Sequence, residues 1–457
     1  MRGIEGALHV LALAREGRFA SEALRDCGAA MAPDDLSLAA SLVYMVLRRE
    51  EMWRRVAEGF LHSGGPKARG KASRTSERPG SGGLRSLPPQ VVDCLLVGTS
   101  GLLELRHFAG GVLVNGLLEY LKGAELGKFV PLVNAVLRAA GERGAERVEA
   151  LRRSPSLEDR ALWSGVPVWS LPAWTKTWKR AELTELFELM RIPPCSSLRI
   201  SPGREGKMTD LLREKQLEAD FSELSGALHL QSTVFPSELP GFEQGWGTVQ
   251  TEGSLLTGSL AERFWKGGAV LDMCSGRGIK AGQILQSLPE ARLECWELSM
   301  GRHKSAVREM RRLGVESRAE LRCGNALELE PRTAPSLIFL DAPCSGSGTW
   351  NRKPESKWQL SWSRFDRLIA VQKSLLTRAL DLCVPGGIII YVTCSLLRQE
   401  NENVVAEVLA ARPDSFELPA PWAGDPFHRG RPWGTYIWPV SPWLDGFYCS
   451  IIMKRAE

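Results

Sequence analysis

Two cysteines stand directly after apolar runs that have the character of buried β-strands. Cys344 follows SLIFLDAP, Cys394 follows GGIIIYVT, and each is succeeded by a serine. A single cysteine is more often a small buried hydrophobe than a nucleophile. Two thiols at the carboxyl ends of neighbouring parallel strands would instead face one crevice, because open α/β sheets bind ligands beyond those ends. The pattern therefore predicts a site where two thiols meet one substrate.

A pair of thiols suits methylation of a pyrimidine at carbon 5. This carbon is a weak nucleophile, and thiolate addition at carbon 6 turns the ring into an enamine that can attack an electrophilic methyl group. A base must then remove the carbon-5 proton, and Cys344 is a candidate. Asp341 is placed to share a proton with ring nitrogen 3. Because a free thiol has a pKa of about 8.5, we expect a cation or the helix starting near Gln399 to favour the thiolate.

A glycine turn follows an earlier strand-like run, AVLDMC. Gly276, Gly278 and Gly282 stand at the start of a helix whose unpaired amides can face an anionic group. Glu297 ends the next strand, nineteen residues after Gly278, where a carboxylate commonly holds both hydroxyls of a ribose. Together these residues predict an adenosine-containing cofactor. A purely structural glycine turn beside an exposed glutamate is the alternative.

Three stretches of different character must position these residues. Up to about Arg143 apolar residues recur at helical spacing, which predicts an all-α domain over residues 1–145 with a flexible basic insertion at 62–90. Residues 150–245 predict a linker and a small α+β module with strands SSLRIS and ALHLQ around the helix KMTDLLREKQL. Residues 246–457 alternate strand, turn and helix, which predicts a parallel sheet covered by helices. Their last strand, GFYCSIIMK, is expected to pair antiparallel at or near an edge.

Three motifs resemble those of the RsmB/Sun (Fmu) family of RNA cytosine-5 methyltransferases. They are LDMCSGRGIK, DAPCSGSGTWNRKPESKW and YVTCSLLRQENENVV, and the resemblance covers about Gly247 to Lys454. Upstream, FVPLVNAVLR resembles the NusB-type RNA-binding domain of RsmB-like members, and LPAWTKTW with SSLRIS resembles their linker and small RRM-like module. The resemblance implies a multidomain chain whose C-terminal domain is a Rossmann-like class I methyltransferase. It also implies S-adenosylmethionine as the cofactor and RNA, ribosomal RNA of the small subunit, as the substrate.

The resemblance also implies a role for each site residue. Cys394 would attack the cytosine, Cys344 would assist product release and Asp341 would border the methyl group and the base. Glu297 would hold the ribose and Asn325 would lie by the adenine. The implied cofactor loop comprises Cys274, Ser275, Gly276, Arg277, Gly278, Ile279 and Lys280.

Two departures from the family pattern bear on cofactor affinity. The family usually has Ala-Pro-Gly-Gly-Lys after the position of Cys274, and usually Asp where Asn325 stands. Arg277 would add positive charge near a cationic sulfonium. Asn325 still offers an acceptor to an adenine amino group, although without charge.

Rings and cations interleave after the Cys344 turn, a composition suited to stacking an unpaired base and meeting phosphates. These residues are Trp350, Arg352, Lys353, Lys357, Trp358 and Trp362. Trp358 and Trp362 are four residues apart, so they could equally well lie on one buried face of a helix. A second basic cluster is interpreted as a solvated helix surface. It comprises Arg302, His303, Lys304, Arg308, Arg311 and Arg312.

Composition excludes several other classes. The chain has 457 residues, average hydrophobic content and a net charge of +5, and the stretch from His62 to Pro89 alone holds an excess of five cations. No apolar run approaches the roughly 20 residues of a membrane span. Ten cysteines without a C-x-x-C pair indicate reduced thiols in a cytoplasm and no metal site. We therefore expect a cytoplasmic monomer. A catalytically impaired RNA-binding assembly factor is the alternative, and a nicotinamide-dependent dehydrogenase is a distant third.

Overall fold

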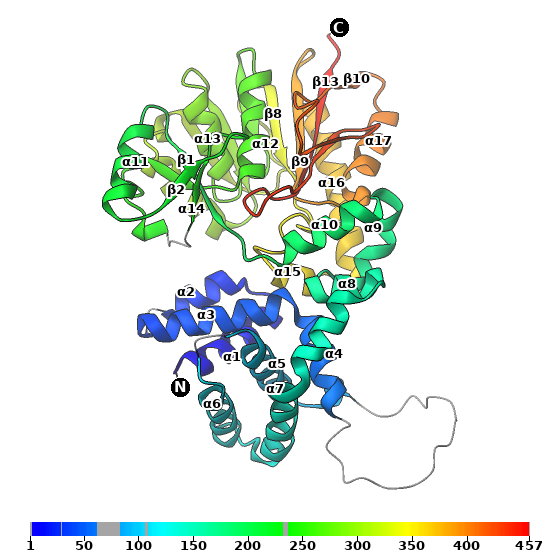
Figure 1. Cartoon of the computed structure of the whole chain (residues 1–457). Coiled ribbons are helices and arrows are strands. Elements are labelled where there is room, and N and C mark those ends of the chain that lie inside the picture. The colour runs from blue at the N-terminus through cyan, green and yellow to red at the C-terminus, as the bar shows by residue number, and fades with distance from the viewer. Residues whose placement is uncertain (1, 29, 62–82, 106–107, 232–235, 457) are drawn as a thin grey trace. The chain divides into compact units, whose positions relative to one another are not determined.

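The computed structural model describes residues 2–28, 30–61, 83–105, 108–231 and 236–456. Most of the expected basic insertion, residues 62–82, lies outside this part of the chain. Two compact units are present (Figure 1). The first comprises Met1–Arg191 with Lys353–Gln359, and the second comprises Ile192–Arg352 with Leu360–Glu457.

The first unit consists of helices throughout its described residues. Apolar side chains recur every three or four positions, as Leu42, Val43 and Val46 do on α3, and pack into one core. The helices are α1 (Arg2–Arg15), α2 (Ala20–Gly28), α3 (Pro33–Arg48), α4 (Glu50–Leu61), α5 (Pro89–Glu104), α6 (Gly110–Gly123), α7 (Val130–Arg153), α8 (Leu157–Ser164), α9 (Leu171–Thr177), α10 (Arg180–Arg191) and α15 (Glu355–Trp358). The first unit thus includes residues 150–191, which the sequence analysis grouped with the small α+β module.

Helix α15 reaches the first unit from a distant part of the sequence. Lys357 Nζ donates to the carbonyl oxygens of Arg48 and Gly165, each at 2.6 Å, and Trp358 Nε1 donates to the carbonyl of Leu47 at 2.6 Å. Burial lowers the pKa of Lys357 to about 7. The expectation that Lys357 is available to RNA phosphates is therefore wrong, because its ammonium group caps backbone carbonyls inside the unit.

A small α+β module opens the second unit. Its antiparallel sheet has the strand order β2-β3-β1-β4, and β1 and β3 coincide with the two strands expected from the sequence. The elements are β1 (Ser196–Ile200), α11 (Glu205–Glu214), β2 (Ala219–Phe221), β3 (Leu228–Leu230) and β4 (Gly247–Val249). Leu198, Met208 and Leu228 contribute to its own apolar core. The expected boundary between the small module and the next domain was residue 245. Strand β4 lies after it but belongs to the small module, because it pairs with β1.

The rest of the second unit is built on a large mixed sheet, in which β7, β6, β5, β8 and β9 pair in parallel and the remaining strands pair antiparallel. Its order is β11-β12-β13-β9-β8-β5-β6-β7, with β10 paired to β13. The strands are β5 (Ala269–Asp272), β6 (Leu293–Glu297), β7 (Ala319–Cys323), β8 (Pro335–Asp341), β9 (Ile388–Thr393), β10 (Ser415–Leu418), β11 (His428–Gly430), β12 (Thr435–Ile437) and β13 (Phe447–Lys454). Strand β13 is antiparallel to β9, as expected, but β12 and β10 extend the sheet beyond it.

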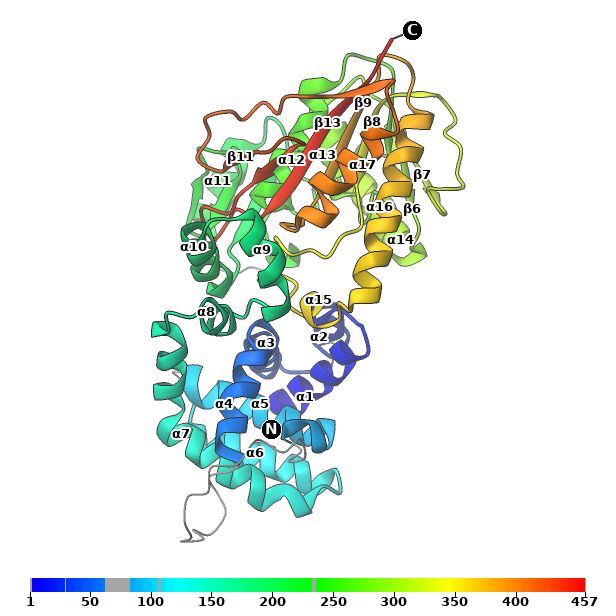
Figure 2. The ribbon, with the colours of Figure 1, turned by 90° about the vertical axis from the view of Figure 1, so that its right-hand side faces the viewer.

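Helices cover both faces of this sheet (Figures 1 and 2). Alternate residues point to opposite faces, so Phe339 and Ile390 join the core that includes side chains of α12 and α13, while Leu340 and Tyr391 belong to the other face. The helices are α12 (Glu252–Phe264), α13 (Ile279–Ser287), α14 (Met300–Arg312), α16 (Trp362–Leu382) and α17 (Glu402–Ala410). The carboxyl ends of β5, β6, β8 and β9 consequently meet along one edge of the sheet.

Candidate active site

The two predicted thiols lie against each other. Strands β8 and β9 pair in parallel up to Asp341 and Val392, so the turns that follow them are neighbours. The sulfur atoms of Cys344 and Cys394 are 3.2 Å apart, and both side chains are partly buried. A planar base placed over this pair would meet both sulfurs at once.

Asp341 connects the thiols to the glycine loop. Its Oδ2 accepts a hydrogen bond from Lys280 Nζ at 2.6 Å, and the Lys280 ammonium also lies 5.0 Å from the centre of the Phe447 ring. Lys280 is buried while Asp341 is half-buried. One cation and one carboxylate thus stand between the expected cofactor loop and the strand that ends at the thiols.

From the sequence we expect a cation or the start of a helix to favour the thiolate form. The surroundings of Cys344 in the structure instead disfavour its thiolate. Helix α17 begins at Glu402 rather than near Gln399, and the Cys344 turn instead faces the buried carboxylate of Glu400. The hydrogen bond with Cys394, burial, and the charges of Cys394 and Glu400 raise the pKa of the Cys344 thiol well above its usual range. Cys344 is therefore held as a neutral thiol near neutral pH.

The glycine loop wraps around the carboxylate of Glu297. Gly276 N donates to Glu297 Oε2 at 3.0 Å, Ser299 N donates to Oε1 at 2.7 Å, and Arg302 pairs with Oε1 at 2.7 Å. Gly276 and Gly278 have φ of +59° and +83°, and a β-carbon on Gly276 would meet nothing within 4 Å. The loop therefore leaves open space beside an acidic strand end, and this fits the ribose of an adenosine cofactor.

The other residues of the expected cofactor site differ in burial and in their hydrogen-bond partners. Cys274 is partly buried and its pKa is raised by burial, Ser275 Oγ donates to the Trp296 carbonyl, and Arg277 is exposed. Asn325 is engaged locally, since its Nδ2 donates to Glu328 Oε1 at 2.8 Å and its Oδ1 accepts from Leu327 N. Ile279 starts α13 and is half-buried.

Sequence reasoning missed two exposed apolar side chains in this region. Leu298 is 70% exposed directly after Glu297, and Leu327 is exposed two residues after Asn325. Large apolar side chains left in water beside a predicted nucleoside site are suited to covering a base. The sequence does not predict their exposure, because an isolated apolar residue after a strand belongs to no repeating pattern.

The second basic cluster is only partly a solvated helix surface. Lys304, Arg308 and Arg311 are exposed on α14. Arg302, however, pairs with Glu297, and the Arg312 guanidinium is buried between Glu309, the Gly247 carbonyl and Thr248. The interpretation was wrong for Arg312, which joins α14 to the small module.

The ring-and-cation segment after Cys344 does not form the expected stacking surface. Trp350 is buried and its Nε1 donates to the Ser345 carbonyl, while Arg352 pairs with buried Asp445 at 2.6 Å. Trp358 lies in the first unit, whereas Trp362 begins α16 and is 62% exposed. Of these three tryptophans Trp350 is buried, Trp358 is partly buried and Trp362 is exposed, because the sequence directly after Cys344 folds inward to support the turn.

Asp272 is a buried acid that the sequence analysis did not single out. It ends β5, and its Oδ1 accepts from Cys274 N at 3.3 Å. Burial and the nearby charge of Asp341 raise the pKa of Asp272 to about 7. Its position after AVL, at the end of the first parallel strand, was the available signal.

We predict that Asp272→Asn removes a pH dependence of stability. In the range between its usual pKa near 4 and about 7, native Asp272 binds a proton that the unfolded chain has lost. The free energy of unfolding should therefore fall as pH rises through this range, by at most about 1.4 kcal/mol per pH unit. Urea unfolding measured from pH 4.5 to 8 should show this fall in the free energy of unfolding in the unaltered protein and in Asp210→Asn, a control at an exposed site. Asp272→Asn should not show it.

Gly348 brings the Cys344 turn close to the loop before β13. Its N–H donates to the Cys394 carbonyl at 3.0 Å and its carbonyl accepts from Gly446 N at 3.0 Å. A β-carbon on Gly348 would lie 2.0 Å from the Gly446 carbonyl oxygen. The backbone approach at this point leaves no room for a side chain.

Gly348→Ala is accordingly expected to displace the thiol-bearing turn and to destabilise the second unit by about 2 kcal/mol or more. Gly301→Ala is the control, because the nearest atom to its added carbon is 3.9 Å away on exposed α14. Its free energy of unfolding should stay within about 1 kcal/mol of the unaltered protein. Equal urea midpoints for the two variants would contradict this account of Gly348.

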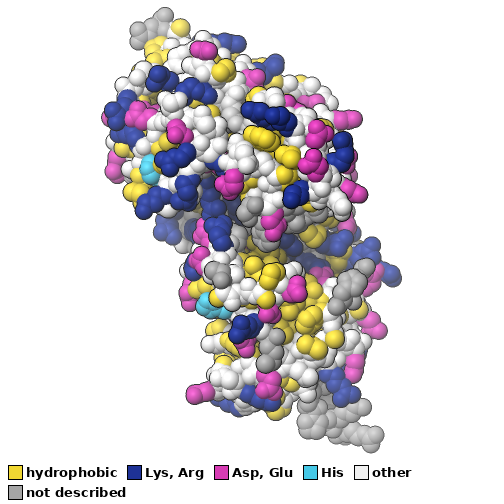
Figure 3. All heavy atoms as spheres, turned by 90° about the vertical axis from the view of Figure 1, so that its left-hand side faces the viewer, with side chains coloured by type: hydrophobic (Ala, Val, Ile, Leu, Met, Phe, Trp, Pro, Cys, Tyr) yellow, Lys and Arg dark blue, Asp and Glu magenta, His cyan; other side chains and the backbone are white. Residues whose placement is uncertain are grey.

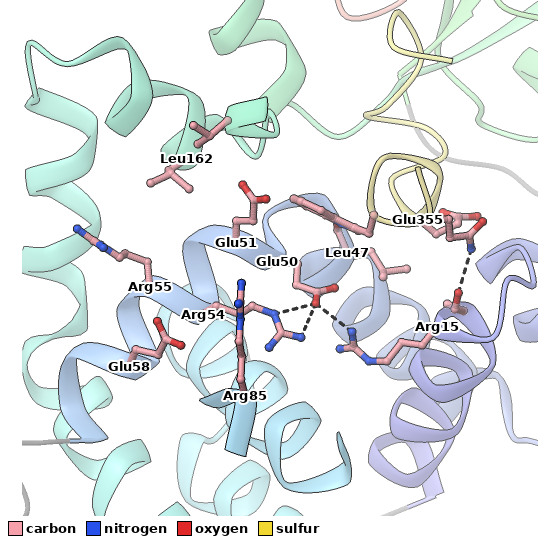
Figure 4. Close-up of a pocket in the computed structure, with 14 residues that line it drawn as sticks. Arg15, Leu47, Glu50, Glu51, Arg54, Arg55, Glu58, Arg85, Leu162 and Glu355 are labelled. Carbon is pink, nitrogen blue, oxygen red and sulfur yellow. Dashed lines mark hydrogen bonds and ion pairs between the residues drawn. The ribbon is translucent and has the colours of Figure 1, made fainter. Parts of the chain in front are cut away.

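A separate cavity of about 840 Å³ lies in the first unit (Figure 4). In its charged lining Glu50 accepts hydrogen bonds from both Arg15 and Arg54. It holds none of the predicted catalytic residues. Among the described residues no group of His, Cys, Asp and Glu could hold a metal ion, and none of the helices described is long and apolar enough to cross a membrane.

The fold of the chain recurs in solved structures. The crystal structure of PH0851 matches with a TM-score of 0.78 and 18% identity, covering 99% of this chain and 98% of that one. A methyltransferase homologue from Pyrococcus horikoshii matches 66% of this chain and 99% of its own, with a TM-score of 0.55 and 22% identity. The chain thus has the fold of these structures, with a Rossmann-like sheet and the predicted site at its carboxyl edge.

Sequence comparisons identify the family. The family model described as 16S rRNA methyltransferase RsmB/F matches residues 263–453. Ribosomal RNA small subunit methyltransferase B of Klebsiella pneumoniae is 30% identical over 401 residues, 84% of this chain and 86% of that protein. The protein of the same name from Vibrio vulnificus is 26% identical over 453 residues, 96% of each chain. The chain belongs to the RsmB/Sun family of methyltransferases, as the sequence motifs predicted.

Proposed function

We propose that this protein transfers a methyl group from S-adenosylmethionine to carbon 5 of a cytosine in RNA, through a covalent cysteine–cytosine intermediate. The observation that carries the proposal is the 3.2 Å separation of the Cys344 and Cys394 sulfurs at the end of two paired strands. Relatives named ribosomal RNA small subunit methyltransferase B support ribosomal RNA as the substrate.

The geometry of the glycine loop supports the cofactor residues that the family resemblance implies. S-adenosylmethionine, when bound, supplies an electrophilic methyl group on a cationic sulfur. Glu297 would hold its ribose, Leu298 and Leu327 would cover the adenine beside Asn325, and the loop from Cys274 to Lys280 would line the remainder. The negative charges of Asp341 and, above about pH 7, Asp272 favour a cation between them.

The chain's own residues then carry the chemistry on the base. The Cys394 thiolate forms a bond to carbon 6, and a proton shared between Asp341 and ring nitrogen 3 neutralises the negative charge that develops on the ring. Once carbon 5 bears the methyl group, its proton passes to a base. The electrons of that bond restore the ring double bond as the carbon–sulfur bond breaks, and Cys394 leaves as a thiolate. Cys344, 3.2 Å away, is the proposed proton acceptor. It acts as the thiolate, after its own proton has passed to water, and returns to the neutral thiol when it takes the carbon-5 proton.

Several features of the surface support RNA as the partner. Exposed cations on α11 and α14 include Arg204, Lys207, Lys304, Arg308 and Arg311, and Figure 3 shows Lys and Arg side chains gathered on one face of the second unit. By family resemblance the first unit is a NusB-like RNA-binding domain and the small module is RRM-like. A monomer acting in the cytoplasm remains our expectation.

Methylation of isolated small-subunit ribosomal RNA tests the proposal. The purified protein, the RNA and S-adenosylmethionine with a labelled methyl group should yield labelled 5-methylcytidine in nuclease digests resolved by mass spectrometry. Bisulfite sequencing of cellular RNA with and without the protein should locate the cytosine. A label confined to another nucleoside would overturn the proposal.

A catalytically impaired assembly factor is the second candidate. It is favoured by Arg277 in the loop and by the engagement of both Glu297 oxygens with protein groups. Calorimetry separates the two candidates, because absence of S-adenosylmethionine binding at millimolar concentration would favour the assembly factor. The dehydrogenase alternative is discarded, since the chain belongs to a methyltransferase family.

A further inference from the structure

A buried carboxylate lies between the two thiol-bearing turns. Glu400 is fully buried at the end of the short helix η6 (Arg398–Glu400). Its Oε1 accepts from Ser345 N at 2.7 Å and from Gln372 Nε2 at 3.0 Å, and its Oε2 accepts from the hydroxyls of Ser345 and Ser395. One side chain therefore holds residues from β8, β9 and α16 together.

The two serines that contact Glu400 directly follow the two cysteines. Ser345 follows Cys344 and Ser395 follows Cys394. We propose that Glu400 is a positioning residue for methyl transfer, whose carboxylate fixes these adjacent turns so that both sulfurs face one base. The proposal rests on the proposed function for the reaction served, whereas the link between the turns is independent of it.

The neighbouring contacts show what Glu400 adds. Asn401 Nδ2 donates to the Ser395 carbonyl at 2.8 Å, and Asn401 Oδ1 accepts from Thr393 Oγ1, so Asn401 holds the Cys394 turn by itself. Ser347 Oγ accepts from Leu396 N at 2.8 Å and provides a neutral link between the turns. Glu400 supplies the charged link, and its oxygens are the shared acceptor for both serine hydroxyls.

Burial raises the pKa of Glu400, whereas the hydrogen bonds from Ser345, Ser395 and Gln372 favour its ionised form. An ionised carboxylate only accepts hydrogen bonds, and the four groups around Glu400 can all donate while carrying no charge themselves. A buried anion without a cation among these partners is costly to maintain. We attribute the retention of this buried carboxylate to a role in the function of the site.

The hydrogen bonds of Glu400 position the two turns, whereas its negative charge affects the ionisation of the Cys344 thiol. The groups facing the Cys344 thiol are Cys394, Glu400 and the Tyr391 hydroxyl, which donates to the Glu400 carbonyl oxygen at 2.8 Å. A negative charge nearby disfavours a thiolate on Cys344. The hydrogen bond with Cys394 and burial raise the pKa of Cys344, the charge of Glu400 raises it further, and attack on the base is left to Cys394.

Glu400→Gln removes this charge while preserving shape. The amide oxygen can still accept from Ser345 N, and the amide nitrogen can donate to the serine hydroxyls, which also accept. We measure alkylation of Cys344 by iodoacetamide against pH, with mass spectrometry of its peptide and no RNA or cofactor present. The midpoint should lie about one pH unit lower in Glu400→Gln than in the unaltered protein. In methylation assays kcat should fall about tenfold or more, with KM for RNA within about threefold.

Two further variants separate charge from geometry. Glu400→Asp keeps the charge but is too short to contact both turns, so kcat should fall while the alkylation midpoint stays near that of the unaltered protein. Glu402→Gln is the matched control. It removes another buried carboxylate two residues away, whose Oε1 accepts from Tyr436 and whose Oε2 pairs with Arg398. It should change neither readout.

The outcomes distinguish this proposal from the proposed function. An unchanged alkylation midpoint in Glu400→Gln, or the same shift in Glu402→Gln, would overturn the role of Glu400. A fall in kcat explained by loss of folded protein, with no shift of the midpoint, would also overturn it. Absence of 5-methylcytidine with the unaltered protein would instead overturn the proposed function, and the alkylation profile would still support or overturn the role of Glu400.

Discussion

Cys394→Ala is expected to lower the rate of methyl transfer to RNA by at least about a thousandfold. The reason is chemical, because carbon 5 becomes nucleophilic only after a sulfur has added to carbon 6. Cys344 lies 3.2 Å away but cannot replace Cys394, since its pKa is raised by the hydrogen bond between the two thiols, by burial and by nearby negative charge. The measurement is labelled methyl incorporated into small-subunit ribosomal RNA per minute.

A matched substitution controls for the loss of a cysteine as such. Cys195 is partly buried in the same unit, and its contact with Arg352 uses the backbone carbonyl rather than the thiol. Cys195→Ala should therefore keep the rate within about twofold of the unaltered protein, in line with the small effects of substitutions away from a site. A Cys394→Ala protein that retained more than a tenth of the normal rate would show that the covalent step runs through another group.

The main sheet was accessible from the sequence because each strand is a short apolar run ended by a polar or glycine turn. Such runs in a strand–helix alternation leave few arrangements, since parallel crossovers are right-handed and strand ends share one edge. The adjacency of Cys344 and Cys394 followed from this rule, and β8 and β9 do pair. The glycine turn and Glu297 were found by the same logic and are joined by a 3.0 Å hydrogen bond.

Other features depended on tertiary contacts that no local pattern contains. Glu400 stands in a polar run that reads as the solvated start of a helix, yet three elements bury it completely. Trp350 carries the composition of a stacking surface but folds inward, because its indole N–H finds the Ser345 carbonyl. Lys357 has the composition of a phosphate contact, but its ammonium group donates to the backbone carbonyls of Arg48 and Gly165, which lie 309 and 192 residues earlier in the chain. The partners of Lys357, and the contacts of Glu400 with Ser345 and Gln372, are distant in sequence, so spacing could not predict them. The partner of Trp350 is only five residues away, but the inward path of this turn is not a regular element that spacing reveals.

Cys344→Ala is expected to produce the opposite outcome from Cys394→Ala, a covalent protein–RNA adduct that accumulates. In this variant the Cys394 thiolate can still add to carbon 6 and the methyl group can still arrive at carbon 5. The missing step is removal of the carbon-5 proton, and without it the electrons that would expel sulfur are not released. A denaturing gel with labelled RNA should show a slowly migrating band that contains both protein and RNA, and methylation should stop after one turnover.

The two single variants decide between this mechanism and its reverse, and the double variant Cys344→Ala/Cys394→Ala is the control that should give no adduct under either. If Cys394 forms the bond to carbon 6, the double variant gives no adduct, and neither does Cys394→Ala alone. An adduct formed by Cys394→Ala but not by Cys344→Ala would exchange the two roles. The neutral state of Cys344 argues against that exchange, because the thiol beside Glu400 is the weaker nucleophile before substrate binds and the stronger proton acceptor once it has lost its own proton.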